Sequence, residues 1–156
     1  MAVRVAIIGC VVFSRRMFHA ALAIEAIDVV AVVTRAQSAV NADFRSLASD
    51  AEAAGIPYLN VEGRGEEAIR DFLITHDVEL GLCVGWSYLL SNEVLAAVPR
   101  GIIGYHPAAL PRNRGRHPFI WALVLGLKET ASTFFLMDAG ADTGAILHQV
   151  AVRPRW

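Results

Sequence analysis

The sequence has few cysteines, almost no net charge and no long hydrophobic run. Its 156 residues include two cysteines, Cys10 and Cys83. Both lie in apolar stretches, so we expect buried thiols rather than a disulfide. The formal net charge of −1 gives no positive field for binding nucleic acid. No apolar run reaches the roughly 18 residues that a membrane-spanning helix needs, and the N-terminal run is too short for a secretory signal. These absences predict a cytoplasmic protein with no membrane or nucleic-acid partner.

Three common catalytic patterns are absent as well. Gly9 ends the first predicted strand, but the other glycines of a G-x-G-x-x-G dinucleotide fingerprint do not follow it. No G-x-S-x-G nucleophile elbow occurs. The spacing of His106, His117, Asp138 and Asp142 matches no standard zinc pattern. We therefore predict no nicotinamide cofactor, no serine hydrolase site and no metal.

Hydrophobic residues, in contrast, make up 55% of the chain. Such an excess is typical of parallel strands that are buried on both faces. The pattern predicts strands over 3–8, 28–34, 57–59, 79–84, 102–105, 133–137 and 145–152. It predicts helices over 14–26, 42–54, 65–75, 117–125 and a short one from 91 that ends before Pro99. This alternation indicates a single α/β domain over 1–156 with a Rossmann-like, doubly wound, mostly parallel sheet. We expect only the last two strands to pair antiparallel.

Polar residues follow two of these strands at the points where the strands end. His106 follows the strand 102–105, while Asp138 and Asp142 follow the strand 133–137. Because ligands bind at the carboxyl ends of such strands, we expect these side chains at one edge of the sheet. A histidine paired with a carboxylate suits general acid–base catalysis near neutral pH. The alternatives are a structural role for His106 and a turn-forming role for either aspartate, above all for Asp138.

A basic loop lies between the two polar segments. Arg112, Arg114 and Arg116 alternate around Gly115. This loop is either a solvated surface segment or a clamp that binds a carboxylate or a phosphate. The residues alone leave both interpretations open, although the loop is too small to form a nucleic-acid surface by itself.

An aromatic and aliphatic loop follows the strand 79–84. It contains Trp86, Tyr88, Leu89 and Leu90. Side chains of these types at the edge of a sheet either cover the core or hold a flat heterocycle between them. The residues alone again leave both interpretations open.

The motifs around His106 and Asp142 are specific at their spacing. They read His106-Pro-Ala-Ala-Leu-Pro111, then Arg114-Gly-Arg-His-Pro118-x2-Trp121, then Met137-Asp-Ala-Gly-Ala-Asp142-Thr-Gly144-Ala-Ile-Leu147. With these blocks the chain resembles the 10-formyltetrahydrofolate-dependent formyltransferases, a family that includes the methionyl-tRNA, glycinamide ribonucleotide and sugar N-formyltransferases. The likeness covers essentially the whole chain and is closest to the sugar enzymes.

The resemblance implies an activity and a set of site residues. It implies transfer of a formyl group from 10-formyltetrahydrofolate, without a metal, to the amine of a small molecule, such as an amino sugar or its nucleotide-linked form. His106 would be the catalytic histidine and Asp142 the catalytic aspartate. Residues that would contact the cofactor are Trp86, Tyr88, Leu89, Leu90, Arg116, Asp138, Ala139, Gly140 and Ala141. Residues that would contact the substrate are Ser14, Pro107, Arg114 and Gly115.

The chain departs from the family pattern at one catalytic position. The family has an asparagine two residues before the catalytic histidine, and here that position is Gly104. Loss of one oxyanion donor costs about 100- to 1000-fold in rate. Either a backbone N–H, Asn113, His117 or a water replaces it, or the activity is weak. A formyltetrahydrofolate hydrolase and a folate- or nucleotide-binding module without turnover are therefore the alternatives to an active transferase.

The chain is also shorter than the family pattern. Family catalytic domains continue for another strand and helix, and the tRNA enzymes add a C-terminal domain, whereas this sequence stops at Trp156. We therefore expect residues 1–156 to be a formyltransferase catalytic domain, compatible with truncation at its C-terminus and without a tRNA-binding part. The apolar composition and an exposed last strand predict a homodimer.

Overall fold

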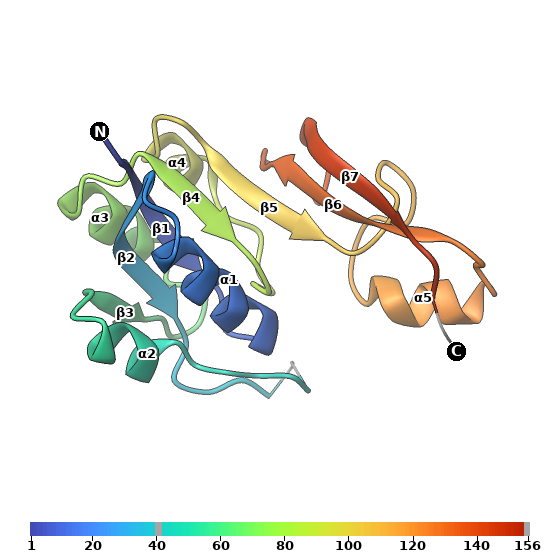
Figure 1. Ribbon diagram of the computed structural model, residues 1–156, viewed down its shortest axis with the longest axis horizontal. Helices are drawn as coiled ribbons and strands as arrows, with labels where there is room; N and C mark the ends of the chain where they lie inside the picture. Colours follow the sequence, from blue (N-terminus) through green and yellow to red (C-terminus); the bar gives the residue numbers. More distant parts are fainter. Residues whose placement is uncertain (40–41, 155–156) are drawn as a thin grey trace. The chain divides into compact units, whose positions relative to one another are not determined.

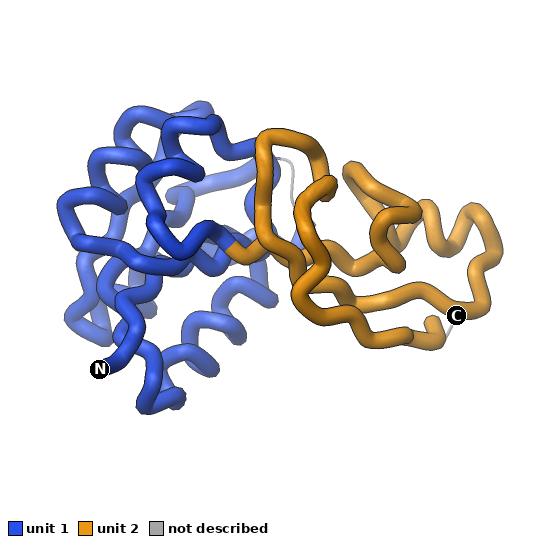
Figure 2. Tube along the Cα trace, turned by 90° about the horizontal axis from the view of Figure 1, so that it is seen from above, with its two compact units in different colours: residues 1–102 blue, residues 103–156 orange. Residues whose placement is uncertain are grey.

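The computed structural model describes residues 1–39 and 42–154. The chain divides into two compact units, residues 1–102 and residues 103–156 (Figure 2). The seven strands follow the order β3-β2-β1-β4-β5-β6-β7. This order confirms the predicted Rossmann-like α/β class, whereas a single domain stays a prediction. No helix in the described part of the chain is both long enough and apolar enough to span a membrane.

Unit 1 is built from alternating strands and helices (Figure 1). Its strands are β1 (Val3–Ile8), β2 (Ile27–Thr34), β3 (Tyr58–Asn60) and β4 (Leu80–Cys83). Its helices are α1 (Val12–Leu22), α2 (Ala48–Ala53), α3 (Glu66–Thr75) and α4 (Asn92–Ala96). β1 pairs with β2 and β4, β2 also pairs with β3, and all three pairings are parallel. The carboxyl ends of these four strands therefore share one edge of the sheet.

The core of unit 1 covers both faces of β1. Val5 and Ile7 belong to an apolar cluster with Phe18 of α1 and Ala51 of α2. Because side chains alternate along a strand, the fully buried residues between and after them face the other side of the sheet. Burial on both faces is what a doubly wound sheet requires, and it accounts for the apolar sequence of the strand.

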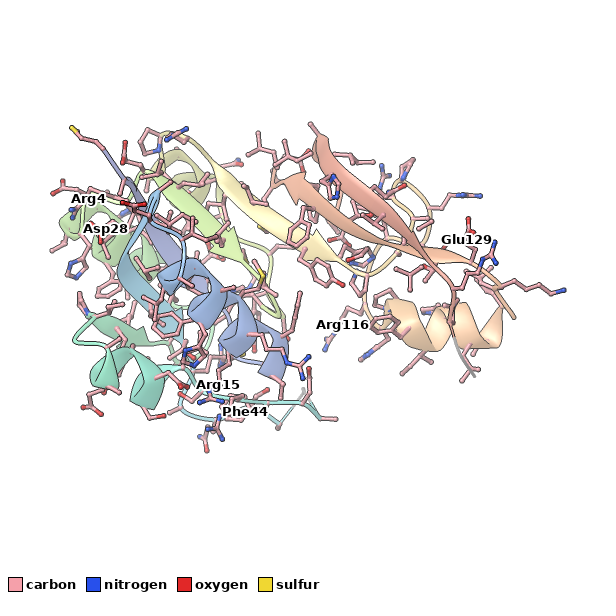
Figure 3. All side chains as sticks on the ribbon, in the orientation of Figure 1. Arg4, Arg15, Asp28, Phe44, Arg116 and Glu129 are labelled. Carbon is pink, nitrogen blue, oxygen red and sulfur yellow. The ribbon has the colours of Figure 1, made fainter. Side chains whose placement is uncertain are left out.

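The predicted helix over 42–54 is wrong in its first half, because α2 begins only at Ala48. The preceding residues form a turn at 42–43 and then pair with the segment that follows β1. The Val12 N–H donates to the Asp43 carbonyl (3.1 Å) and the Arg45 N–H to the Cys10 carbonyl (2.9 Å). Phe44, labelled in Figure 3, forms a β-bridge with Val11. These tertiary hydrogen bonds override a local composition that favours helix.

Unit 2 contains the antiparallel strands and one helix (Figure 1). Its elements are β5 (Ile102–His106, whose first residue belongs to unit 1), α5 (Pro118–Val124), β6 (Thr130–Leu136) and β7 (Ile146–Val152). β6 pairs antiparallel with β5 and with β7. The predicted antiparallel pairing of the last two strands is thus confirmed.

The antiparallel pairing of β5 with β6 corrects the expected meeting of two carboxyl strand ends. Ile103 lies opposite Leu136, and His106 lies opposite Thr133. The end of β6 is therefore beside the start of β5, one strand length from His106. A residue that follows β6 reaches His106 only if the loop between β6 and β7 turns back along β5.

Candidate functional site

His106 is the last residue of β5 and is held inside unit 2. Alternation along the strand places its side chain on the same face as Ile102 and Gly104, and all three residues are buried. The side chain of His106 is only 7% exposed. Burial restricts the imidazole to one orientation, which is a requirement for a group that transfers protons at a defined position.

Both ring nitrogens of His106 face oxygen atoms. Nε2 lies 2.8 Å from the main-chain carbonyl of Asn113, which only accepts hydrogen bonds, so Nε2 carries a proton in this arrangement. Nδ1 lies 3.5 Å from Oδ2 of Asp142. The contact between Nδ1 and Oδ2 is an ion pair only when both ring nitrogens are protonated. The pair predicted from the sequence is therefore present in unit 2.

Asp142 is anchored by the basic loop that follows β5. Its Oδ2 accepts a hydrogen bond from the Gly115 N–H (2.9 Å), and its carbonyl accepts one from Nε of Arg114 (3.1 Å). Asp142 itself has a left-handed backbone, with φ of 55°. The loop thus fixes the carboxylate next to His106, and Arg114 is a partner of the Asp142 segment.

Asp138 forms the turn that carries Asp142. Its Oδ1 accepts hydrogen bonds from the Thr143 hydroxyl and from the Gly140 N–H (3.0 Å). These two hydrogen bonds hold the pKa of the Asp138 carboxyl below its ordinary value, and the bond from Thr143 has the larger effect. Asp138 therefore has the turn-forming role expected for it. The turn also contains Ala139 and Ala141, which are exposed, and Gly140, which is half-buried.

The loop after His106 is tied to the neighbouring strands by two residues that sequence reasoning missed. The Thr133 hydroxyl donates to the Ala108 carbonyl (2.7 Å). The Gln149 side-chain amide on β7 donates to the Leu110 carbonyl (3.0 Å) and to Oγ1 of Thr133 (2.9 Å). Polar residues in otherwise apolar strands were the available signal, but their partners depend on strand register. Pro107 lies half-buried at the start of this loop.

Arg116 lies in the same loop but at the surface. Its side chain is exposed, near the start of α5 (Figure 3). An exposed cation is available to an anionic ligand, and nothing in this placement contradicts the predicted contact with a cofactor.

The predicted aromatic loop lies in unit 1, after β4. Trp86 and Tyr88 are half-buried, Leu89 is 47% exposed and Leu90 is buried. The guanidinium carbon of Arg35 lies 5.7 Å from the ring centre of Trp86 and 5.1 Å from that of Tyr88. Arg35 was not anticipated, because its distance from both rings in sequence hides the contact.

Ser14 is placed where a contact with a substrate is blocked. It is fully buried, its hydroxyl donates to the Val84 carbonyl (2.6 Å) and accepts from the Val11 N–H (3.2 Å). The hydroxyl thus ties the start of α1 to the end of β4. This placement corrects the predicted substrate-binding role of Ser14.

The two cysteines are buried, as expected, and neither takes part in a disulfide within the described residues. Burial, with a smaller contribution from the nearby Cys10, raises the pKa of Cys83 to about 12. Its thiol therefore stays protonated at neutral pH and is a poor nucleophile. In residues 1–39 and 42–154 no group of three His, Cys, Asp or Glu side chains is arranged to hold a metal ion.

Comparison with known proteins identifies the family. The formyl transferase family matches residues 3–153. The chain belongs to this family. It is 34% identical over 151 residues to the cytosolic 10-formyltetrahydrofolate dehydrogenase of Xenopus tropicalis, an alignment that covers 94% of this chain and 16% of that protein. It is 30% identical over 156 residues to the methionyl-tRNA formyltransferase of a Roseiflexus species, covering 97% of this chain and 48% of the relative.

A solved structure of the same fold agrees with this assignment. The phosphoribosylglycinamide formyltransferase of Anaplasma phagocytophilum superposes with a TM-score of 0.82 at 25% identity, over 99% of this chain and 74% of that one.

The chain spans less than half the length of the two curated relatives described above. The resemblance to formyltransferases expected from the sequence motifs is confirmed, and the likeness to the sugar enzymes in particular stays a prediction.

Within this formyltransferase fold, the space beside Gly104 is filled. A Cβ at Gly104 would lie 2.8 Å from Cζ of Phe135 and 2.9 Å from Cγ of Met137. Phe135 is the cross-strand neighbour of Gly104 and is 3% exposed. The position at which the family pattern has an asparagine therefore has an apolar wall. Gly104 brings no side-chain donor to His106, and whether another group replaces the family's asparagine stays a prediction.

Proposed function

We propose that this chain transfers a formyl group from 10-formyltetrahydrofolate to the amine of a small acceptor, most simply an amino sugar or its nucleotide-linked form. The observation that carries the proposal is the pair formed by the buried His106 and the half-buried Asp142 in a member of the formyl transferase family. Relatives in this family carry names that include formyltetrahydrofolate and formyltransferase, which supports the same chemistry here.

The reaction needs a group that moves one proton. 10-Formyltetrahydrofolate would supply the formyl carbon when bound. The attacking amine must lose a proton and the departing nitrogen must gain one, and His106 is the group we assign to that transfer. The Asp142 carboxylate, 3.5 Å from Nδ1, would orient the ring for this transfer.

The ring can act on a substrate only after one hydrogen bond is exchanged. Nδ1 faces Asp142, so Nε2 is the atom that must meet the substrate. In this structure Nε2 is bonded to the carbonyl of Asn113. We therefore expect Asn113, whose backbone is left-handed with φ of 57°, to move away from the ring when the substrate binds.

Each unit contains residues that we propose as cofactor contacts. In unit 1 the accessible apolar surface of Leu89 and the rings of Trp86 and Tyr88 fit a flat heterocycle. In unit 2 the turn 138–142 offers main-chain groups at the surface. Arg114, Gly115, Pro107 and Arg116 remain the proposed contacts for the anionic parts of substrate and cofactor.

A second candidate is a folate-binding protein with impaired turnover. The observation that favours it is the apolar wall of Phe135 and Met137 where an oxyanion donor is expected. Under this candidate a reduced folate still binds, but formyl transfer is slower by the roughly 100- to 1000-fold that a missing donor costs. The third candidate, a hydrolase, differs only in using water as the acceptor.

The test measures consumption of 10-formyltetrahydrofolate with nucleotide-linked and free amino sugars. We expect amine-dependent turnover that His106→Ala lowers by about 100- to 10,000-fold. His148→Ala, which removes an exposed histidine of β7 in the same unit, is the matched control and should retain activity. Unchanged turnover in His106→Ala would refute the assigned roles.

Two further results separate the candidates. Consumption of the cofactor without any amine would identify a hydrolase. Calorimetric titration with 5-formyltetrahydrofolate, a stable reduced folate, separates an impaired binding protein, which gives heat but no turnover, from a chain that does not use folate at all and gives no heat.

A further inference from the structure

Arg35, Trp86 and Tyr88 form a cluster in unit 1 that we call the Arg35 cluster. Arg35 directly follows β2, while Trp86 and Tyr88 follow β4. The guanidinium carbon lies 5.7 Å and 5.1 Å from the two ring centres. Guanidinium groups stack on aromatic rings through their faces, which leaves the N–H groups at their edges for hydrogen bonds in the plane.

The cluster lies at the point of the sheet where ligands bind in doubly wound folds. The order within unit 1 is β3-β2-β1-β4. Along the chain, β2 and β3 extend the sheet on one side of β1 and β4 lies on its other side, so the strand order reverses between β1 and β4. Ligands bind outside the carboxyl ends of the strands at such a reversal. Because β1 lies between β2 and β4, Arg35 reaches past the end of β1 to contact the two rings.

Two donors of the cluster are positioned by the protein. Arg35 Nη1 donates to the Gly63 carbonyl at 2.7 Å, which fixes the guanidinium with other N–H groups remaining on the same plane. The Nε1 atom of Trp86 is buried and has no hydrogen-bond partner among the described residues. A buried donor without an acceptor is unfavourable, and a ligand oxygen would relieve it.

A cavity of about 270 Å³ lies next to Arg35. Its lining residues follow β2 and β3, and they are Arg35, Ala36, Gln37, Val61, Glu62 and Gly63. This volume is at the lower end of ligand pockets, so it suits one charged group or one ring rather than a whole large molecule. Glu62 also lines this cavity and is exposed, so its carboxylate partly offsets the positive charge of Arg35 on that side.

We propose that the Arg35 cluster binds the oxygen atoms of an anionic group, a phosphate or a carboxylate, of a ligand that enters at this edge of unit 1. Guanidinium and indole N–H groups are both hydrogen-bond donors, and anionic oxygens are strong acceptors for groups of this kind. Anion binding itself does not depend on the proposed function. The source of the anion does rest on it, because the candidates are the diphosphate of a nucleotide-linked acceptor and the glutamate tail of the folate.

The first experiment titrates the full chain with inorganic pyrophosphate in a calorimeter. Arg35→Gln should weaken binding by about 10- to 100-fold, as expected for loss of a charged hydrogen bond. Arg64→Gln removes the neighbouring exposed arginine and is the control for charge alone, so its affinity should remain within about twofold of the wild type. Equal affinity in wild type and Arg35→Gln, or no binding at all, would overturn the proposal.

Trp86→Phe distinguishes a ligand site from a packing role. The change removes the Nε1 donor and keeps an aromatic ring for Arg35. If the donor serves a ligand, pyrophosphate affinity falls while the melting temperature stays the same or rises, because an unsatisfied buried group is lost. A lower melting temperature with unchanged pyrophosphate affinity would show that the cluster is only structural.

The two sources of the anion are separated by comparing ligands in wild type and Arg35→Gln. A selective loss of affinity for UDP and dTDP would assign the site to the acceptor. A selective loss for 5-formyltetrahydrofolate, with no change for pteroate, which lacks the glutamate, would assign it to the cofactor. Loss of neither would overturn the proposal. Pyrophosphate binding in a chain without formyl transfer would refute the proposed function alone.

Discussion

Gly104 and Phe135 face each other across β5 and β6, on the buried side of the strand pair that also carries His106. The ring of Phe135 occupies the space that a side chain at position 104 would need. Glycine lowers strand stability, and an aromatic cross-strand neighbour restores part of the packing that it forfeits. The glycine is thus a packing feature of this chain as well as a departure from the family pattern.

Gly104→Asn is therefore expected to damage the protein rather than to restore a donor. The new Cβ would meet Phe135 and Met137 at under 3 Å, and overpacking of this kind lowers the free energy of unfolding by about 1–3 kcal/mol. Urea unfolding measures the change. Adding Phe135→Leu to Gly104→Asn should recover part of the loss, as a double-mutant cycle would show. An asparagine variant that is both stable and faster would contradict this view of the site.

The loop between β6 and β7 is the element that determines whether the site forms. Its two ends meet where the Leu136 N–H donates to the Ala145 carbonyl at 2.8 Å. Between these ends the loop must also bring Asp142 back to His106. Gly144 sits at the crossing, where a Cβ would overlap the Leu136 carbonyl oxygen. The glycine of the Asp-x-Gly motif is consequently a steric requirement of the loop.

We predict that Gly144→Ala displaces this loop, lowering the free energy of unfolding by about 1–3 kcal/mol and reducing formyl transfer. Gly126→Ala is the control, because Gly126 has φ of +60° but open space around its Cβ position. It should cost about 1–2 kcal/mol through backbone strain while activity is retained. Equal activity of both variants would show that the loop tolerates the added methyl group.

Helices α1 and α2 are linked by an ion pair that makes stability depend on pH. Arg15 Nε lies 2.9 Å from both oxygens of Asp50, and His19 Nε2 lies 3.2 Å from Oδ1. The hydrogen bond from Arg15 is the main cause that holds the pKa of Asp50 below its ordinary value. The carboxylate is therefore more easily ionised in the folded chain than in the unfolded one.

The pair stabilises the fold above the unfolded aspartate pKa of about 3.9 and loses this contribution as the pH falls through the lower folded value. Urea midpoints measured between pH 6 and pH 3 should fall more steeply for the wild type than for Asp50→Asn. Glu52→Gln, an exposed acidic residue of the same helix, should follow the wild type. Parallel curves for wild type and Asp50→Asn would contradict a role for the pair in stability.

The elements that the sequence predicted well are those with strong local signals. β1 agrees at both ends, and α5 begins at Pro118 and stops before Gly126, as proline and glycine favour at those places. The first half of the helix expected over 42–54 is wrong, because hydrogen bonds with Cys10 and Val12 hold Asp43 and Arg45 in a non-helical arrangement. Local composition carries no information about such partners.

The site was predicted in its residues but not in its geometry. Motif spacing indicated the pair of His106 and Asp142, while the direction of β6 was inferred from a parallel sheet and was wrong. Arg35 and Gln149 were missed, because each acts on segments that are far away in sequence. Contacts of this kind follow from strand register, which a single sequence does not specify.

At the scale of the whole molecule, the predicted homodimer would use the exposed strand of unit 2. Every residue of β7 is exposed, and Ile146, Leu147 and Val150 are each at least 45% exposed. The strand has no charged residue, and uncharged edge strands favour pairing with another chain. The homodimer nonetheless stays a prediction until the mass in solution is measured.

Light scattering over a range of protein concentrations measures this assembly directly. We expect a mass near twice that of the chain, and a shift toward the monomer when Val150→Lys places a charge on the exposed strand. Arg153→Lys, which keeps the charge just beyond the strand, should leave the mass unchanged. A monodisperse monomer at all concentrations would remove the homodimer.

The contact between Gly104 and Phe135 also constrains how this protein can have diverged. A single substitution to asparagine meets a ring, and a single loss of the ring leaves a cavity, so each one-step path between the two arrangements passes through a less stable protein. The two positions should therefore change together over evolutionary time. Across homologous chains, residues larger than glycine at position 104 should coincide with smaller or more polar residues at position 135, and this pairing would identify which homologues share the present design.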